Sequence, residues 1–141
     1  RSLDSPYFGE AELAAAEGRM DEAANIYAGY RAETGCIYCF AFRSANMHDR
    51  AGRTEEAVAL YQTASSMYLG TDYISSAPLK SLAFLRLGEI YSERGETNDA
   101  IEAYSAFAEL WENADTELQG QVSYARNRVD QLLKQAAREP Q

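Results

Sequence analysis

A glycine–alanine–tyrosine pattern occurs three times in the sequence with identical internal spacing. Each copy begins with a glycine, has an alanine five residues later and a tyrosine four residues after the alanine, and the copies occupy residues 18–27, 52–61 and 95–104. The glycines are 34 and 43 residues apart, so the period is 34 residues with about nine residues inserted before the third copy. A fixed period of this length is typical of repeat proteins, in which each unit buries its apolar face against the next.

Each position of the pattern suits a turn between two antiparallel helices. Glycine ends a helix well because it adopts the left-handed conformation without a steric penalty. Thr54 and Thr97 follow their glycines as expected N-caps, and acidic residues in the next turn face the positive helix end. Small residues are expected where the two helices of each hairpin cross. These are Ala23, Ala57 and Ala100 on the second helices, and Ala11, Ala45 and Gly88 on the first.

The pattern resembles the tetratricopeptide repeat, a helix-turn-helix unit of 34 residues. The third copy matches the family's signature offsets at Phe84, Leu87, Gly88, Tyr91, Gly95, Ala100, Tyr104 and Phe107. The first two copies depart in the first helix, where Glu10 and Ser44 replace leucine and Ala14 and His48 replace tyrosine. The resemblance implies an all-α fold, an α-solenoid of three repeats at about 5–36, 37–70 and 78–111. An insertion at 71–77 and a capping helix at about 116–137 complete a single expected domain over residues 1–141.

The expected helices span 6–17, 21–33, 37–50, 55–69, 78–94, 98–111 and 116–137. Only three prolines occur in 141 residues, which favours helix throughout. Ser5 is the expected N-cap of the first helix, and Gly70 is expected to close the fourth. The last helix carries apolar residues at spacings of four and three, with a polar opposite face. These residues are Leu118, Val122, Ala125, Val129 and Leu132. One apolar stripe with a polar back is what the end cap of a repeat array requires.

The charge of the chain limits its partners. There are 22 acidic and 13 basic residues, which give a formal net charge of −9. Nucleic-acid binding is not expected, because it requires a basic surface that neutralises phosphates. No apolar run approaches the roughly 18 residues of a membrane span. The sequence starts at Arg1 rather than Met, so we expect a mature product or an excised fragment.

Cys36 and Cys39 form a Cys-x-x-Cys pair at the junction of the first two repeats. A c-type haem site is excluded because Phe40 stands where a histidine is needed. A zinc site normally takes four ligands, whereas the chain offers two cysteines and the single histidine His48. Two alternatives are favoured over redox or metal chemistry. The cysteines form a disulfide in an exported or extracellular protein, or they are two reduced thiols in a cytoplasmic one.

We expect no enzymatic activity and no cofactor. His48 is the only histidine and is interpreted as a packing residue, because a Ser44–His48 pair has no third group or oxyanion hole beside it. No glycine-rich loop suited to cradling phosphates is present.

The resemblance also implies a binding groove lined by the first helix of each repeat. The corresponding positions form three pairs at a spacing of four residues: Phe8 and Glu12, Phe42 and Asn46, and Leu85 and Glu89. Only Asn46 fits the family's carboxylate clamp, so an acidic C-terminus is not the expected partner. An apolar strip rimmed by glutamate suits a peptide or helix with hydrophobic anchors between basic residues. The alternative is that the insertion or the last helix covers this strip.

Two functions from different classes follow. The first is a non-catalytic protein–protein interaction scaffold, part of a larger protein. Residues 110–119 and the helix beyond them are similar to the end of tetratricopeptide regions in large bacterial regulatory proteins, which implies a bacterial source. The second is a structural subunit that self-associates end to end into oligomers or filaments. Tyr7 and Leu13 on the first helix are the expected contacts, because that helix is apolar over much of its surface.

Overall fold

The computed structural model describes residues 6–36, 38, 40–66, 73–112 and 116–139. This part of the chain consists of helices without a strand: α1 (Pro6–Ala16), α2 (Met20–Thr34), α3 (Ala41–Arg50), α4 (Thr54–Ser65), α5 (Tyr73–Glu93), α6 (Thr97–Leu110) and α7 (Thr116–Arg138). The predicted all-α repeat fold is confirmed. The helices form two compact units, Arg1–Met67 and Tyr68–Gln141, each described here by itself. The single domain over residues 1–141 stays a prediction.

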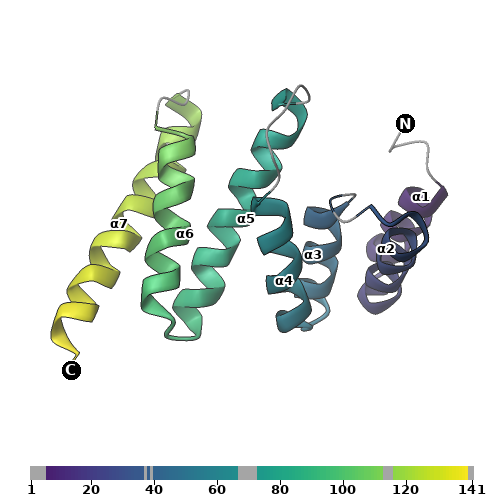
Figure 1. Cartoon of the computed structure of the whole chain (residues 1–141), viewed down its shortest axis with the longest axis horizontal. Helices are drawn as coiled ribbons and strands as arrows, with labels where there is room; N and C mark the ends of the chain where they lie inside the picture. Colours follow the sequence, from purple (N-terminus) through teal and green to yellow (C-terminus); the bar gives the residue numbers. More distant parts are fainter. Residues whose placement is uncertain (1–5, 37, 39, 67–72, 113–115, 140–141) are drawn as a thin grey trace. The chain divides into compact units, whose positions relative to one another are not determined.

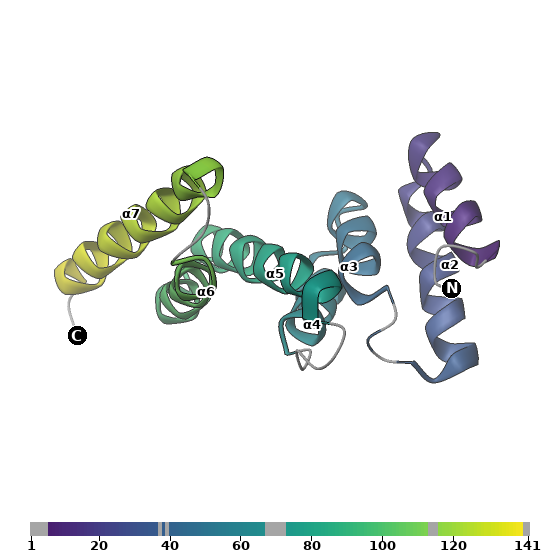
Figure 2. The same cartoon turned by 90° about the horizontal axis from the view of Figure 1, so that it is seen from above.

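Within each unit, consecutive helices pack against one another as antiparallel hairpins. In the first unit α1 packs on α2, α2 on α3, and α3 on α4; in the second, α5 packs on α6 and α6 on α7. Figure 1 shows α5, α6 and α7 side by side with alternating directions, and Figure 2 shows α1 lying along α2.

The three predicted turns have the same backbone geometry. Gly18, Gly52 and Gly95 have φ values of 81°, 80° and 73°, in the left-handed region that glycine adopts most readily. The residue after each glycine donates its N–H to the carbonyl five residues earlier, at 2.8, 2.8 and 2.9 Å. This is the Schellman arrangement, which satisfies carbonyls left open at a helix end. The repeat is therefore present in the backbone as well as in the sequence.

The small residues lie where the sequence predicts them. Ala11 and Ala45 on the first helices, and Ala23, Ala57 and Ala100 on the second helices, are all 0% exposed. Gly88 lies close to α6, because a Cβ built on it would lie 2.9 Å from two ring carbons of Tyr104. The tyrosines of the pattern, Tyr27, Tyr61 and Tyr104, are buried as well.

The expected threonine N-caps are wrong by one residue. Arg53 and Glu96 hold the N-cap positions of α4 and α6, and neither makes a side-chain capping hydrogen bond. Thr54 and Thr97 are instead the first helical residues. The Schellman turn determines this register, because it leaves a single residue between the glycine and the next helix. The Ser5 cap lies outside the described residues.

The third helix starts later than predicted, at Ala41 rather than at residue 37. Phe40 precedes it with φ 53° and ψ 22°, a left-handed conformation that is strained for a residue with a Cβ and ends any helical run. Residues 37 and 39 lie outside the described part.

The insertion at 71–77 is not wholly a loop. Helix α5 already begins at Tyr73, so residues 73–77 are helical and Pro78 lies inside the helix rather than at its start. Proline there removes one backbone hydrogen bond, and a helix of 21 residues tolerates this loss near its N-terminal end. Helix α4 ends at Ser65, earlier than the predicted residue 69, and Gly70 lies outside the described residues.

The last helix caps the second unit as predicted. Val122, Ala125 and Leu132 of α7 are at most 3% exposed and join the core formed with Tyr104 and Phe107 of α6. Val129 is partly buried against the same core. The side chain of Leu118 lies outside the described residues. The apolar stripe read from the sequence therefore identifies the packed face of α7.

Candidate interaction surfaces

The expected groove residue Glu12 is tied to its neighbours rather than standing free. Its carboxylate accepts a hydrogen bond from the Tyr27 hydroxyl at 2.7 Å and from the Arg43 guanidinium at 3.3 Å. Burial, together with this hydrogen bond, raises the pKa of Tyr27 well above its usual value. Tyr27 therefore stays a neutral donor, and Glu12 links α1, α2 and α3 on the first-helix face of the first unit.

The second pair on that face is partly occupied by the protein itself. The ring of Phe42 lies 5.7 Å from the ring of Tyr61, centroid to centroid, so α4 covers part of it. Asn46 is half-buried. The side chain of Phe8 lies outside the described residues.

In the second unit, the two residues of the third pair, Leu85 and Glu89, lie in different surroundings. Leu85 packs against the core of the third repeat. Glu89 is about one-third exposed and forms an ion pair with Arg86 at 2.9 Å. Glu89 also lines a hollow at the junction of α5, α6 and α7, whereas Leu85 does not.

This hollow, called here the α5–α7 hollow, has a volume of about 410 Å³. Its lining residues come from all three helices: Glu89, Ser92 and Glu93 of α5, Tyr104 of α6, and Tyr124 and Arg128 of α7. It therefore combines two carboxylates, one guanidinium and two phenol rings.

The polar groups of the α5–α7 hollow are held in place. Arg128 donates to the Ser92 hydroxyl at 2.5 Å and to the Gln131 side-chain oxygen at 2.6 Å, and its guanidinium carbon lies 5.9 Å from the centre of the Tyr104 ring. The rings of Tyr104 and Tyr124 meet edge to face at 6.1 Å. Burial, helped by the Tyr124 hydroxyl, raises the pKa of Tyr104 to about 12, so this hydroxyl stays neutral.

The arrangement suits binding rather than catalysis. Tyr124 is 44% exposed although its ring edge is fixed against Tyr104, and a fixed, half-exposed tyrosine offers contact area at a small entropic cost. The sequence analysis named Glu89 and missed Tyr124 and Arg128. Their spacing of four residues on the last helix was the available signal.

The comparisons with known proteins identify one segment. Residues 82–114 match the family model described as Tetratricopeptide repeat. This segment is similar to a tetratricopeptide repeat. The matched segment covers most of α5 and all of α6, which together form the third repeat predicted from the sequence. No curated protein and no solved structure matches the chain. A repeat of this kind suggests a protein–protein interaction scaffold, and the family is generally non-catalytic.

The first two helical repeats contain the residues that the sequence analysis considered for catalysis or metal binding. His48 is 5% exposed, and its Nδ1 lies 2.8 Å from the backbone oxygen of Ser44 rather than from the Ser44 hydroxyl. That hydroxyl is buried and has no hydrogen-bond partner among the described residues. The ring thus bonds to its own helix, which agrees with a packing role for His48.

Cys36 lies just after α2 and is half-buried. No free cysteine occurs among the described residues, but Cys39 lies outside them, and the disulfide stays a prediction. In the same part of the chain, no group of three or more His, Cys, Asp or Glu side chains is placed to hold a metal ion. None of the described helices combines the length and apolar character that a membrane span requires.

Proposed function

We propose that the chain is a non-catalytic interaction scaffold that binds a peptide or helix of a partner protein along the first-helix faces of its repeats. In the first unit the candidate residues are Glu12, Phe42 and Asn46, and in the second unit they are Leu85 and Glu89, each set within its own unit. The observation that carries the proposal is the α5–α7 hollow, where Glu89 borders a cavity that also contains an exposed tyrosine.

Charge supports a particular kind of partner. Glu89 and Glu93 face the α5–α7 hollow from one helix, and the chain as a whole carries a net charge of −9. Like charges repel, and complementary charges speed association and select partners. The partner segment is therefore one with apolar anchors between basic residues.

Truncating the exposed ring of the α5–α7 hollow tests this proposal. Peptides selected on the full chain from a random display library are expected to bind Tyr124→Ala at least about fivefold more weakly, because truncating a central tyrosine typically costs about 1 kcal/mol or more. Leu133→Ala is the matched control, since Leu133 is 52% exposed and lies nine residues along α7, on its opposite side. Fluorescence polarisation measures both affinities. Weaker binding to Leu133→Ala with unchanged binding to Tyr124→Ala contradicts the proposal.

Self-association is the second candidate function, and Leu13 is the observation that favours it. Leu13 is 57% exposed on α1, the largest exposed fraction among the described large hydrophobic residues. A contact from one end of the chain to the other end of the next copy does not close on itself and gives fibres. Tyr7 belongs to the same proposal, although its side chain lies outside the described residues.

If copies associate through α1, Leu13→Glu will disperse them without unfolding α1, because the substituted side chain already faces solvent. Ala28→Glu adds the same charge at an exposed position of α2 and is expected to leave assembly unchanged. Light scattering over a concentration series gives the mass of all three proteins. A parent chain that stays monomeric at every concentration removes this second function and leaves the scaffold proposal standing.

We further propose that Cys36 and Cys39 form a disulfide and that the protein is exported, because disulfides persist mainly in oxidising compartments. When freshly isolated protein is alkylated without reductant, its intact mass is expected to show no added alkyl group. After reduction, two alkyl groups are expected. Two alkylated thiols in the unreduced sample would instead favour a cytoplasmic protein.

A further inference from the structure

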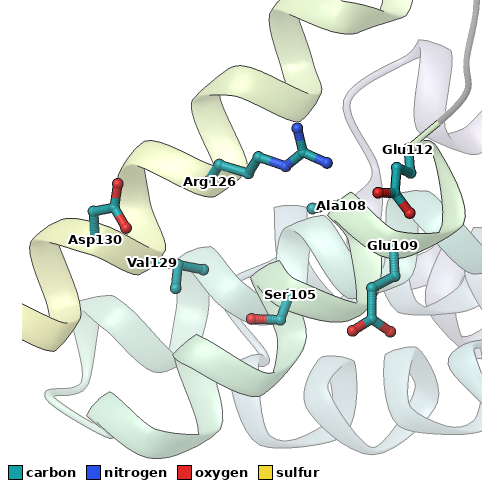
Figure 3. A pocket seen from close by; sticks show the side chains of 7 residues that line it. All are labelled: Ser105, Ala108, Glu109, Glu112, Arg126, Val129 and Asp130. Carbon is teal, nitrogen blue, oxygen red and sulfur yellow. The ribbon is translucent and has the colours of Figure 1, made fainter.

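A second hollow lies between α6 and α7 and is lined by these two helices and by Glu112 in the turn after α6 (Figure 3). It has a volume of about 340 Å³, and we call it the α6–α7 hollow. Its lining residues are Ser105, Ala108 and Glu109 of α6, Glu112 of the turn after α6, and Arg126, Val129 and Asp130 of α7. None of these residues lines the α5–α7 hollow.

The shape of the α6–α7 hollow suits a helix. Ser105, Ala108 and Glu109 lie on one side of α6 over about one turn, a length of about 6 Å, and Glu112 extends this side in the turn after the helix. Ala108, which is 7% exposed, and the half-buried Val129 provide an apolar floor between the two ribbons. Another helix offers apolar side chains at the matching spacing of three or four residues.

The charge around the α6–α7 hollow determines which kind of partner helix can bind there. Glu109, Glu112 and Asp130 are exposed carboxylates around the floor, and Arg126 is the single cation among the lining residues. Acidic rims attract basic partners and repel acidic ones. A lysine or arginine beside the apolar anchors of an incoming helix can lay its stem on the floor and place its charge at the rim.

The same charges disfavour the exposed end of a second copy as the occupant. Leu13 of α1 is flanked at spacings of three and four by Glu10 and Glu17, which are exposed and have the same sign as the rim. We propose that the α6–α7 hollow docks an amphipathic helix of a partner protein, with small apolar side chains flanked by lysine or arginine. This surface is separate from the α5–α7 hollow.

The test uses a synthetic helix as the probe. The peptide has 14 residues, the length of α6, with alanine and leucine on one face, lysine on both flanks and no aromatic residue. Trp111 is the only tryptophan of the chain and directly precedes Glu112 of the rim, so its emission reports docking. Saturable binding to the full chain at concentrations below about 1 mM is expected, together with a change in Trp111 emission. Absence of saturable binding in that range overturns the proposal.

Paired charge reversals locate the binding site. Glu109→Lys with Asp130→Lys is expected to weaken binding about tenfold or more, because both substitutions put a like charge at the rim. Glu33→Lys with Glu102→Lys makes the same change in net charge at exposed positions outside both hollows, and is expected to change the affinity less than about threefold. Equal weakening by both pairs would mean a general attraction to an acidic protein and would overturn the proposal.

Two further controls separate the remaining explanations. A peptide with serine in place of its alanine and leucine residues keeps the lysines and is expected to lose binding; equal binding of this peptide overturns the apolar floor and the proposal with it. Light scattering of the parent chain tests for a second copy in the α6–α7 hollow. If the parent chain is a dimer and the double variant Glu109→Lys with Asp130→Lys is a monomer, the occupant is a second copy, and the proposal of a partner helix is overturned. Weaker binding of the library-selected peptides to Tyr124→Ala concerns the α5–α7 hollow alone.

Discussion

Gly88→Ala is expected to destabilise the protein by about 1–2 kcal/mol, although alanine normally stabilises a helix relative to glycine by about 0.5–1 kcal/mol. The new Cβ would lie 2.9 Å from Cδ1 and Cγ of Tyr104, closer than carbon atoms in contact allow. Tyr104 is 1% exposed and packs edge to face on Tyr124, so a shift of its ring away from the new Cβ would disturb this contact. Overpacking of a filled core costs about 1–3 kcal/mol, which exceeds the gain in helix propensity.

Gly120→Ala is the matched control for this prediction. Gly120 also lies inside a helix, but nothing lies within 4 Å of a Cβ built on it. Urea unfolding should therefore show a gain of about 0.5–1 kcal/mol for Gly120→Ala and a loss for Gly88→Ala. A gain in both variants would show that the third hairpin relaxes to accept an alanine, as the first two hairpins do with Ala11 and Ala45.

Ala100→Leu is expected to cost about 1–3 kcal/mol, because the longer side chain has to fit where α5 and α6 cross. Ala100 is 0% exposed and belongs to the same buried cluster as Tyr104 and Phe107. Ala59→Leu places the same side chain on an exposed position of α4 and is expected to change stability by less than about 0.5 kcal/mol. Thermal unfolding compares the two variants. If Ala100→Leu melts with the parent, the alanine does not mark the crossing point.

The parts of the fold that were predictable from the sequence depend on local backbone requirements. Gly18, Gly52 and Gly95 mark their turns because a left-handed residue is nearly always needed there, and the same turn recurs at a fixed period. The start of α3 was mispredicted because Phe40 adopts a left-handed conformation that its residue type does not favour. The helical start of α5 was missed because serines, which occur at positions 75 and 76, are also common in turns.

The binding surface was less accessible to sequence reasoning. Glu89 was found because it occupies a position given by the resemblance to tetratricopeptide repeats. Tyr124 and Arg128 were missed because their place in the hollow depends on the rotation of α7 about its own axis. The apolar stripe of α7 indicates which side is buried, but its flanks acquire neighbours only through packing on α5 and α6. The neighbours of a residue on such a flank are determined by tertiary packing and cannot be predicted from the stripe alone.

Hydroxyl-radical footprinting of the full chain with a selected peptide tests the central claim most directly, because it locates the binding face on the unmodified protein. Tyr124 and Leu133 serve as paired reporters, since both are about half exposed and they lie on opposite sides of α7. The scaffold proposal predicts that bound peptide lowers the oxidation of Tyr124 and leaves that of Leu133 unchanged. Unchanged oxidation of Tyr124 at saturating peptide would contradict it.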